Sequence, residues 1–113
     1  MMHMTNETSI WLAIQPADFR KGLDGFIALC RQSLEQDPKN EARFVFINKS
    51  KTMIRALSYD GTGFWLMTKR LSKGKFQGWP KHGQRATALT AKQLSQLLKG
   101  PSIPVIVDDK YAA

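Results

Sequence analysis

Short apolar runs alternate with polar stretches along the chain, and this pattern predicts a small sheet. The predicted strands cover residues 10–14, 43–48, 53–59 and 64–71. The last of these runs also fits the spacing of a helix. The turn-forming pair Asp60-Gly61 just before it, together with its aromatic content, favours a strand.

Two other stretches carry apolar residues at helical spacing. In residues 23–36 these residues fall on one face, and Pro38 ends the pattern because the residue before a proline disfavours helical geometry. In residues 90–99, Thr90 and Gln93 have the spacing of a capping box. We therefore predict an α+β fold in which a small, mostly antiparallel sheet is packed by two helices.

The whole chain, residues 1–113, is expected to form a single domain. Residues 1–8 are polar and unpatterned, as is typical of a frayed terminus, and residues 101–113 predict either an added edge strand or a loose end. Residues 73–87 predict a long, mobile, basic loop. No run is long and apolar enough for a membrane span or a signal peptide, so we expect a cytoplasmic protein.

Positive charge is concentrated in the middle of the chain, whose net charge is +8. Residues 1–42 carry a net charge of −2 and residues 100–113 a net charge of −1. Residues 43–99, in contrast, hold twelve Lys and Arg but only one acid, Asp60, for a net charge of +11. Because like charges repel on a compact domain, this distribution indicates a polyanionic partner such as nucleic acid.

Aromatic side chains lie between the lysines of residues 59–80. Cations that contact phosphates and flat rings that stack on bases are typical of nucleic-acid surfaces. The alternative is an aromatic core with a solvated basic rim, and composition alone slightly favours that alternative. We expect Trp65 in the core because its neighbours are apolar, whereas Trp79 is a candidate stacking residue.

Residues that catalysis or metal binding would need are sparse. The single cysteine, Cys30, excludes an internal disulfide, and its place on the apolar helix face predicts an inert core thiol. The glycines lack the spacing of a phosphate-binding loop. Asp18, Asp24 and Asp60 are better explained as helix-start, loop and turn residues than as a magnesium site. We expect a binding protein that has no catalytic residues, metal or cofactor.

Several short blocks occur in a characteristic order between about residues 10 and 100. They are Ile10-Trp11-Leu12-Ala13, Pro16-x-Asp18-x-Arg20-Lys21-Gly22-x-Asp24-Gly25, Phe44-Val45-Phe46-x-Asn48, Asp60-Gly61-Thr62-Gly63-Phe64-Trp65-Leu66, Lys69-Arg70-Leu71, Gly74-x-Phe76, Trp79-Pro80 and Leu89-Thr90-x-x-Gln93-Leu94-x-x-Leu97-Leu98-x-Gly100. Together they resemble the small accessory protein, of the TnpB type, of the bacterial insertion sequence 66 family.

This resemblance implies an accessory factor for transposition, encoded beside a separate transposase that carries the catalytic acids. DNA is the partner that the resemblance implies. The departure from the family lies after Gly100, where relatives tend to have an acidic-aromatic pair and this chain has Pro101-Ser102 and an apolar tail. The tail raises the alternative of a stranded or repurposed relative.

Our leading hypothesis is that a basic face in residues 43–99 binds DNA, such as the element ends, to assist the transposase. The candidate DNA contacts are Arg20, Lys21, Lys69, Arg70, Lys73, Lys75 and Trp79. A solvated helix start, or a salt bridge to Asp18 or Asp24, explains Arg20 and Lys21 equally well. The alternatives are an adapter that docks on the transposase without binding DNA itself and, less favoured, an RNA-binding protein.

Overall fold

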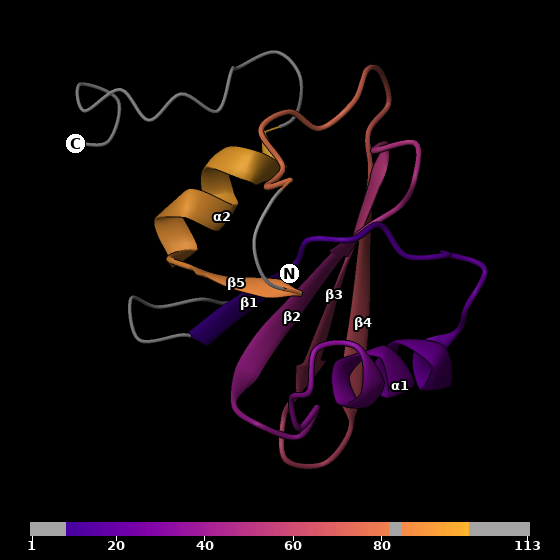
Figure 1. Cartoon of the computed structure of the whole chain (residues 1–113), viewed down its shortest axis with the longest axis vertical. Coiled ribbons are helices and arrows are strands. Elements are labelled where there is room, and N and C mark those ends of the chain that lie inside the picture. Colours follow the sequence, from indigo (N-terminus) through magenta and orange to yellow (C-terminus); the bar gives the residue numbers. More distant parts are fainter. Residues whose placement is uncertain (1–8, 82–84, 100–113) are drawn as a thin grey trace.

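The computed structural model describes residues 9–81 and 85–99 (Figure 1). Within them the elements follow the order β1 (Ser9–Ala13), α1 (Leu23–Gln32), β2 (Ala42–Ile47), β3 (Met53–Tyr59), β4 (Phe64–Arg70), β5 (Ala86–Leu89) and α2 (Ala91–Leu98). The α+β class, the four predicted strands and the two helices are confirmed, and the ambiguous run before residue 71 is a strand. The frayed start and the tail that we expected both lie outside the described residues.

The sheet is mixed rather than mostly antiparallel, which is a minor difference from the prediction. Its strand order is β4-β3-β2-β1-β5, in which β1 and β2 run parallel while the other three neighbouring pairs run antiparallel. The cause is the connection through α1. A helix between two neighbouring strands returns the chain to the end where the first strand began, which makes the strands parallel.

The fifth strand, β5, was not predicted, and its first two residues fall at the end of the stretch predicted as a long basic loop, residues 73–87. Its four residues pair antiparallel with β1, from Ile10 opposite Leu89 to Ala13 opposite Ala86. A stretch as short as Ala-Thr-Ala-Leu carries little strand propensity of its own. Pairing with β1, distant in sequence, therefore gives β5 its conformation.

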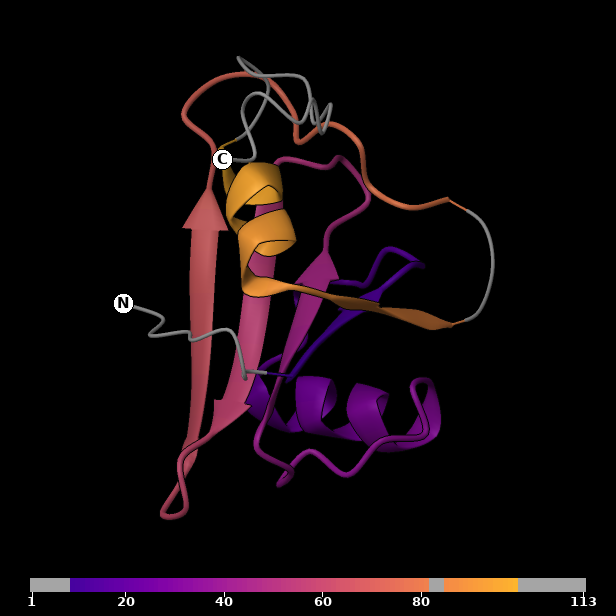
Figure 2. The ribbon, with the colours of Figure 1, turned by 90° about the vertical axis from the view of Figure 1, so that its left-hand side faces the viewer.

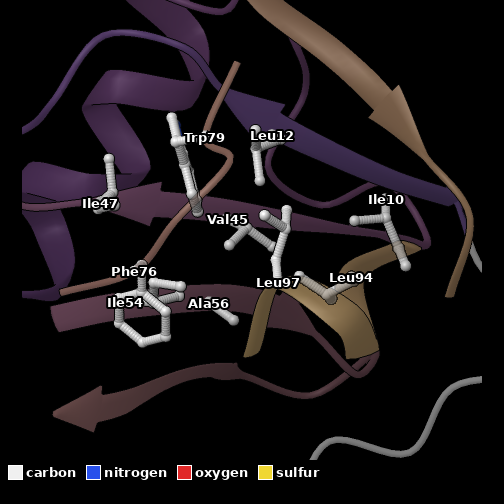
Figure 3. Close-up of a cluster of buried hydrophobic side chains, with 10 residues drawn as sticks. All are labelled: Ile10, Leu12, Val45, Ile47, Ile54, Ala56, Phe76, Trp79, Leu94 and Leu97. Carbon is white, nitrogen blue, oxygen red and sulfur yellow. The ribbon is translucent and has the colours of Figure 1, made fainter. Parts of the chain in front are cut away.

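Both faces of the sheet are buried, because side chains alternate along each strand and each face has its own helix. On the α2 side the buried cluster, shown in Figure 3, consists of Ile10, Leu12, Val45, Ile47, Ile54, Ala56, Phe76, Trp79, Leu94 and Leu97. On the α1 side the buried cluster consists of Ala13, Ala17, Phe26, Cys30, Leu34, Ala42, Phe44, Phe46 and Leu57. This arrangement explains why β2 is apolar at consecutive positions.

The helix ends follow from local chemistry. Thr90 Oγ1 accepts a hydrogen bond from Gln93 N at 3.1 Å and Gln93 Oε1 accepts one from Thr90 N at 2.9 Å, which confirms the predicted capping box. Helix α1 ends at Gln32, before the predicted residue 36. The chain leaves the helical path there, and Glu35 takes a left-handed conformation with φ of 55°.

Candidate nucleic-acid interface

One end of the sheet collects several connections between the strands. Because β1 and β2 run parallel and β3 runs antiparallel to both β2 and β4, the chain leaves β1, β2 and β4 at the same end (Figure 2). We call it the basic end and define it by six cations of the β2–β3 connection, the end of β4 and the segment after β4: Lys49, Lys51, Arg70, Lys73, Lys75 and Lys81. All six except the half-buried Lys51 are exposed.

Backbone hydrogen bonds hold these connections together. Ala17 N donates to Ile47 O at 2.8 Å, which fixes the segment after β1 against the end of β2. Phe76 N donates to Lys51 O at 2.8 Å, which fixes the segment after β4 against the β2–β3 hairpin. Lysines that are far apart in the sequence are thereby presented on one supported surface.

The hairpin between β2 and β3 is itself well ordered by a side chain. Asn48 Oδ1 accepts hydrogen bonds from Thr52 N at 2.9 Å and from Met53 N at 3.1 Å. Lys51 takes a left-handed conformation there, with φ of 62°. Asn48 therefore closes the loop that presents Lys49 and Lys51.

Two hollows lie between the connections. One, of about 500 Å³, is lined in part by Arg20 and Lys49. The other, of about 160 Å³, is lined in part by Lys51 and Lys81. Cations from different connections thus line the same hollows, and Asp18, the ion-pair partner of Arg20, also lines the one of about 500 Å³.

The adjacent basic residues Lys69 and Arg70 do not form a single patch. Successive side chains of a strand point to opposite faces, so the two residues lie on opposite sides of β4. Lys69 lies on the α2 side, where its Nζ donates to the carbonyl oxygen of Leu98 in the last turn of α2. Arg70 lies on the α1 side and is exposed. We therefore count only Arg70 as part of the basic end.

Arg20 is engaged in an ion pair. Its Nη2 lies 2.8 Å from Asp18 Oδ2, and its Nε donates to Asp18 Oδ1 at 3.0 Å. These side-chain bonds, with the bond from the Arg20 backbone N–H, hold the pKa of Asp18 well below its usual range. Of the explanations considered for Arg20, the structure therefore shows the salt bridge to Asp18. The Arg20–Asp18 pair adds no net charge to the surface. Lys21 is exposed beside it.

The two tryptophans are placed opposite to our expectation. Trp79 is only 5% exposed, packs with Phe76 in the α2-side cluster and donates its indole Nε1 to Ala13 O at 3.0 Å. It cannot stack on a base from this position, so the expected role of Trp79 was wrong. Trp65 is 59% exposed, so its expected place in the core was also wrong. The reason is that β4 is an edge strand, whose neighbours in sequence are apolar without being fully covered.

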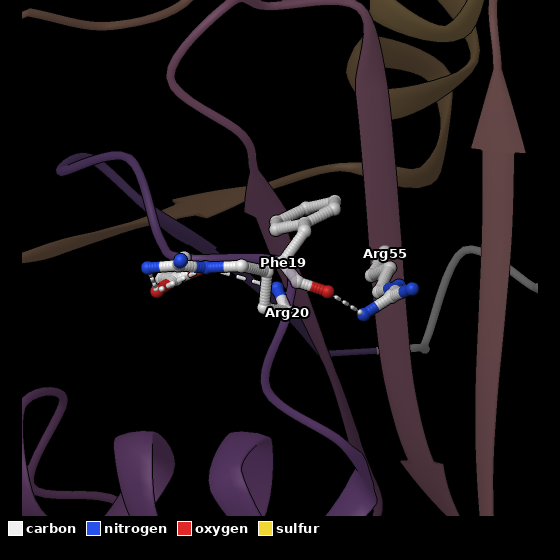
Figure 4. A network of polar contacts seen from close by, with 4 residues as sticks. Phe19, Arg20 and Arg55 are labelled. Atoms are coloured by element: carbon white, nitrogen blue, oxygen red, sulfur yellow. Dashed lines mark hydrogen bonds and ion pairs between the residues drawn. The ribbon is translucent and has the colours of Figure 1, made fainter.

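Arg55 is a residue of this region that the sequence analysis missed (Figure 4). From β3 its Nη1 donates to Phe19 O at 2.8 Å and to Lys21 O at 3.1 Å, while its Nε donates to Thr68 Oγ1 at 3.0 Å. Its guanidinium also lies over the rings of Phe19 and Phe26. Arg55 thus fixes the loop that carries Arg20 and Lys21. An arginine inside a mostly apolar strand was the available signal.

Replacing Arg55 with lysine is expected to lower the free energy of unfolding by about 1–3 kcal/mol. The reason is that an ammonium cannot reproduce the planar set of donors, so the carbonyl oxygens of Phe19 and Lys21 would lose their hydrogen bonds to the guanidinium. Urea unfolding followed by circular dichroism measures the change. Arg70→Lys, the same substitution at an exposed position, is the control and should change the value by less than about 0.5 kcal/mol. Equal effects of the two substitutions would contradict the anchoring role of Arg55.

Asp60 organises the turn between β3 and β4. Its Oδ1 accepts hydrogen bonds from Thr62 N and Gly63 N, both at 2.9 Å, and its Oδ2 accepts one from Trp65 Nε1 at 2.8 Å. These bonds, foremost that from the Thr62 N–H, hold the pKa of Asp60 well below its usual range. The predicted turn role of Asp60 is confirmed, and the same carboxylate fixes the exposed indole of Trp65.

Acidification is expected to release the Trp65 indole. Because the pKa of Asp60 is lower in the folded than in the unfolded chain, its contribution to stability is full above the ordinary aspartate pKa of about 4 and is lost progressively as the pH falls from there to the lower pKa of the folded chain, where the carboxylate takes up a proton and its bond to the indole weakens. The indole N–H resonance of Trp65 should shift on acidification, and Asp60→Asn should abolish the shift. The Trp79 indole, bonded to a backbone carbonyl, is the internal control. A shift of both indoles together would contradict local release.

Further features of residues 9–81 and 85–99 concern metal ligands, the thiol and helix length. No group of three or more His, Cys, Asp and Glu in this part of the chain could hold a metal ion. Cys30 is buried, and its burial raises the pKa of the thiol to about 12, which confirms the prediction of a core thiol. No helix among these residues is long and apolar enough to cross a membrane.

Comparisons with known proteins show the family to which the chain belongs. The family model described as IS66 Orf2 like protein matches residues 8–106. Similar relatives include two proteins of Sinorhizobium fredii named as uncharacterized. One, y4hO, is 32% identical over 88% of this chain and 86% of its own length. The other, y4jC, is 37% identical over 80% of this chain and 77% of its own length. No solved structure matches the chain.

Proposed function

Since the chain belongs to the IS66 Orf2-like family of an insertion-sequence transposition system, we propose that it is a non-catalytic accessory protein that binds duplex DNA through its basic end. In this role it would hold DNA for a separate transposase, and the element ends are the DNA segments that we propose it holds.

The observation that carries this proposal is the concentration of cations at the basic end. Six cations lie there, two in the β2–β3 connection, one at the end of β4 and three in the segment after β4, and the ion pairs between described residues, Arg20–Asp18 and Arg85–Glu35, involve none of them. Phosphates of a DNA backbone would supply the missing negative charge, and their binding would release counterions. Lys21 and Lys69 lie outside this group. Lys21 stays a proposed contact at its margin, and Lys69 can contribute only in competition with its bond to α2.

Duplex DNA is favoured over a single strand by the placement of the aromatic rings. A surface that holds single-stranded nucleic acid normally offers rings on which bases stack. Among the aromatic residues next to the basic end, Phe76 and Trp79 are 2% and 5% exposed, and the half-buried ring of Phe19 has the Arg55 guanidinium over it. The basic end therefore offers charge with little stacking surface, which suits the outside of a double helix.

A salt-titrated binding assay tests the proposal. The purified protein is mixed with duplexes that carry the terminal repeats of an adjacent element, with scrambled duplexes, and with single-stranded DNA and duplex RNA of equal length. We expect duplex DNA to bind most tightly, with an affinity that falls steeply as salt rises. Preference for the repeats would identify end recognition, whereas no binding at about 50 mM salt would overturn the proposal.

A second candidate function is the adapter that docks on the transposase without binding DNA. The exposed Trp65 at the β3–β4 turn supports a protein contact, because it lies away from the basic end and is fixed by Asp60. Co-purification with the transposase that persists after nuclease treatment, together with no binding of the isolated protein to DNA, would favour the adapter.

A further inference from the structure

Strand β4 forms one outer edge of the sheet, and no strand of the described residues pairs with its outer side. The hydrogen bond from Asp60 N to Gly63 O, 3.0 Å long, fixes the alternation of its pairing with β3. Bonded and non-bonded pairs alternate in an antiparallel ladder. The backbone N–H and C=O groups of Phe64, Leu66, Thr68 and Arg70 therefore point away from β3, toward the open edge of the sheet.

The first half of this edge lacks the usual protection against strand pairing. Natural edge strands are commonly protected by charges, prolines or bulges. In β4 the charges come only at the last two positions, whereas residues 64–67 are all apolar. Among them Trp65 is 59% exposed, and its ring is fixed in place by the 2.8 Å bond to Asp60. The edge thus combines free backbone groups with an exposed, pre-organised aromatic side chain, as pairing surfaces do.

We propose that a second copy of this chain pairs on this edge, so that two β4 strands run antiparallel about a two-fold axis at Leu66. Residues whose backbone N–H and C=O groups point away from β3 must lie opposite such residues of the other copy, so that the two strands can form hydrogen bonds. A pairing of Leu66 with Leu66 satisfies this condition. In this register Phe64 faces Thr68, and Trp65 faces Met67 on the α2 side of the joined sheet. The proposal is independent of whether the basic end binds DNA.

Charge favours this register and this direction. Lys69 of each copy would lie diagonally across from Trp65 of the other copy, and its ammonium would exchange its bond to Leu98 O for a contact near the carboxylate of Asp60. A register shifted toward the carboxyl ends of the strands would instead bring the Lys69 and Arg70 side chains of both copies together. Antiparallel pairing also places the two basic ends at opposite ends of the dimer, which limits repulsion between copies that each carry a net charge of +8.

Cysteine cross-linking tests the register. In a hydrogen-bonded antiparallel pair, opposite Cα atoms lie about 5.5 Å apart, within the range that a disulfide spans. Leu66→Cys is therefore expected to form a covalent dimer under mild oxidation. In Thr68→Cys, the two cysteines would lie about 13 Å apart along the strands and should not cross-link. Cys30 is buried and does not interfere.

Sedimentation equilibrium tests the association of the unmodified chain. We expect a concentration-dependent dimer, which Trp65→Lys weakens by at least about tenfold because it brings a positive charge toward Lys69 of the other copy. Ala88→Lys adds the same charge to an exposed site on β5, at the opposite edge of the sheet, and should leave the dimer intact. Higher salt should preserve the dimer, whereas it weakens DNA binding.

A chain that stays monomeric at high concentration, or equal cross-linking of the two cysteine variants, would overturn the proposal. Protection of the β4 edge in such a monomer, seen as slow amide exchange at Leu66 and Thr68, would also contradict it. That result would assign the edge to another segment of the same chain.

Discussion

Replacing Trp79 with alanine is expected to lower the free energy of unfolding by about 3–5 kcal/mol. Trp79 is 5% exposed in the α2-side cluster, and its indole donates a hydrogen bond to Ala13 O at 3.0 Å. The substitution would leave a cavity between the segment after β4 and the end of β1, and would remove the donor from a backbone carbonyl. A loss of this size is a large part of the stability of a small domain. Urea unfolding measures it.

Trp65→Ala is the matched control for this prediction. It removes the same side chain from a site that is 59% exposed, so the cost should be about 1 kcal/mol or less despite the lost bond to Asp60. The sequence alone placed Trp65 in the core and Trp79 at the surface, and the structure places them the other way round. Which of the two variants loses more free energy of unfolding therefore distinguishes the two placements. A larger destabilisation by Trp65→Ala than by Trp79→Ala would contradict the fold as described.

The elements with strong local signals could be predicted from the sequence. The capping box at Thr90 and Gln93 requires only residues three apart, and α1 and the four longer strands follow from hydrophobic spacing. What could not be predicted depends on contacts between distant residues. Strand β5 exists because β1 pairs with it, and the parallel pairing of β1 with β2 becomes visible only when both strands are placed in one sheet.

The candidate site was predictable in its charge but not in its shape. Counting residues 43–99 revealed the excess of cations, yet Lys49 and Lys51 become neighbours of the segment after β4, which carries Lys81, only through the topology. The separation of Lys69 from Arg70 follows from strand alternation and could have been predicted once β4 was accepted as a strand. The burial of Trp79, which lies outside any helix or strand, had no local signal.

Neutralising three lysines of the basic end is expected to weaken duplex binding by about two orders of magnitude at low salt. The variant changes Lys49, Lys73 and Lys75 to glutamine. All three are exposed, so the fold should tolerate the changes. If each lysine contacts a phosphate, the slope of log affinity against log salt should become less steep by about two to three units.

A control with the same net charge separates local contacts from overall attraction. Arg31, Lys39 and Lys92 are also exposed and lie away from the basic end, on α1, in the connection before β2 and on α2. Their triple replacement by glutamine should change the salt slope by less than about one unit, because distant charges contribute only through the screened field of the molecule.

The salt dependence of duplex affinity tests the basic end as a DNA-binding surface most directly. It is measured by fluorescence anisotropy for the unmodified chain and the two triple variants side by side. We predict a steep slope for the unmodified chain, nearly the same slope for the control, and a slope flatter by about two to three units for Lys49→Gln/Lys73→Gln/Lys75→Gln. Equal slopes for the two variants would contradict the assignment of the DNA contacts to the basic end.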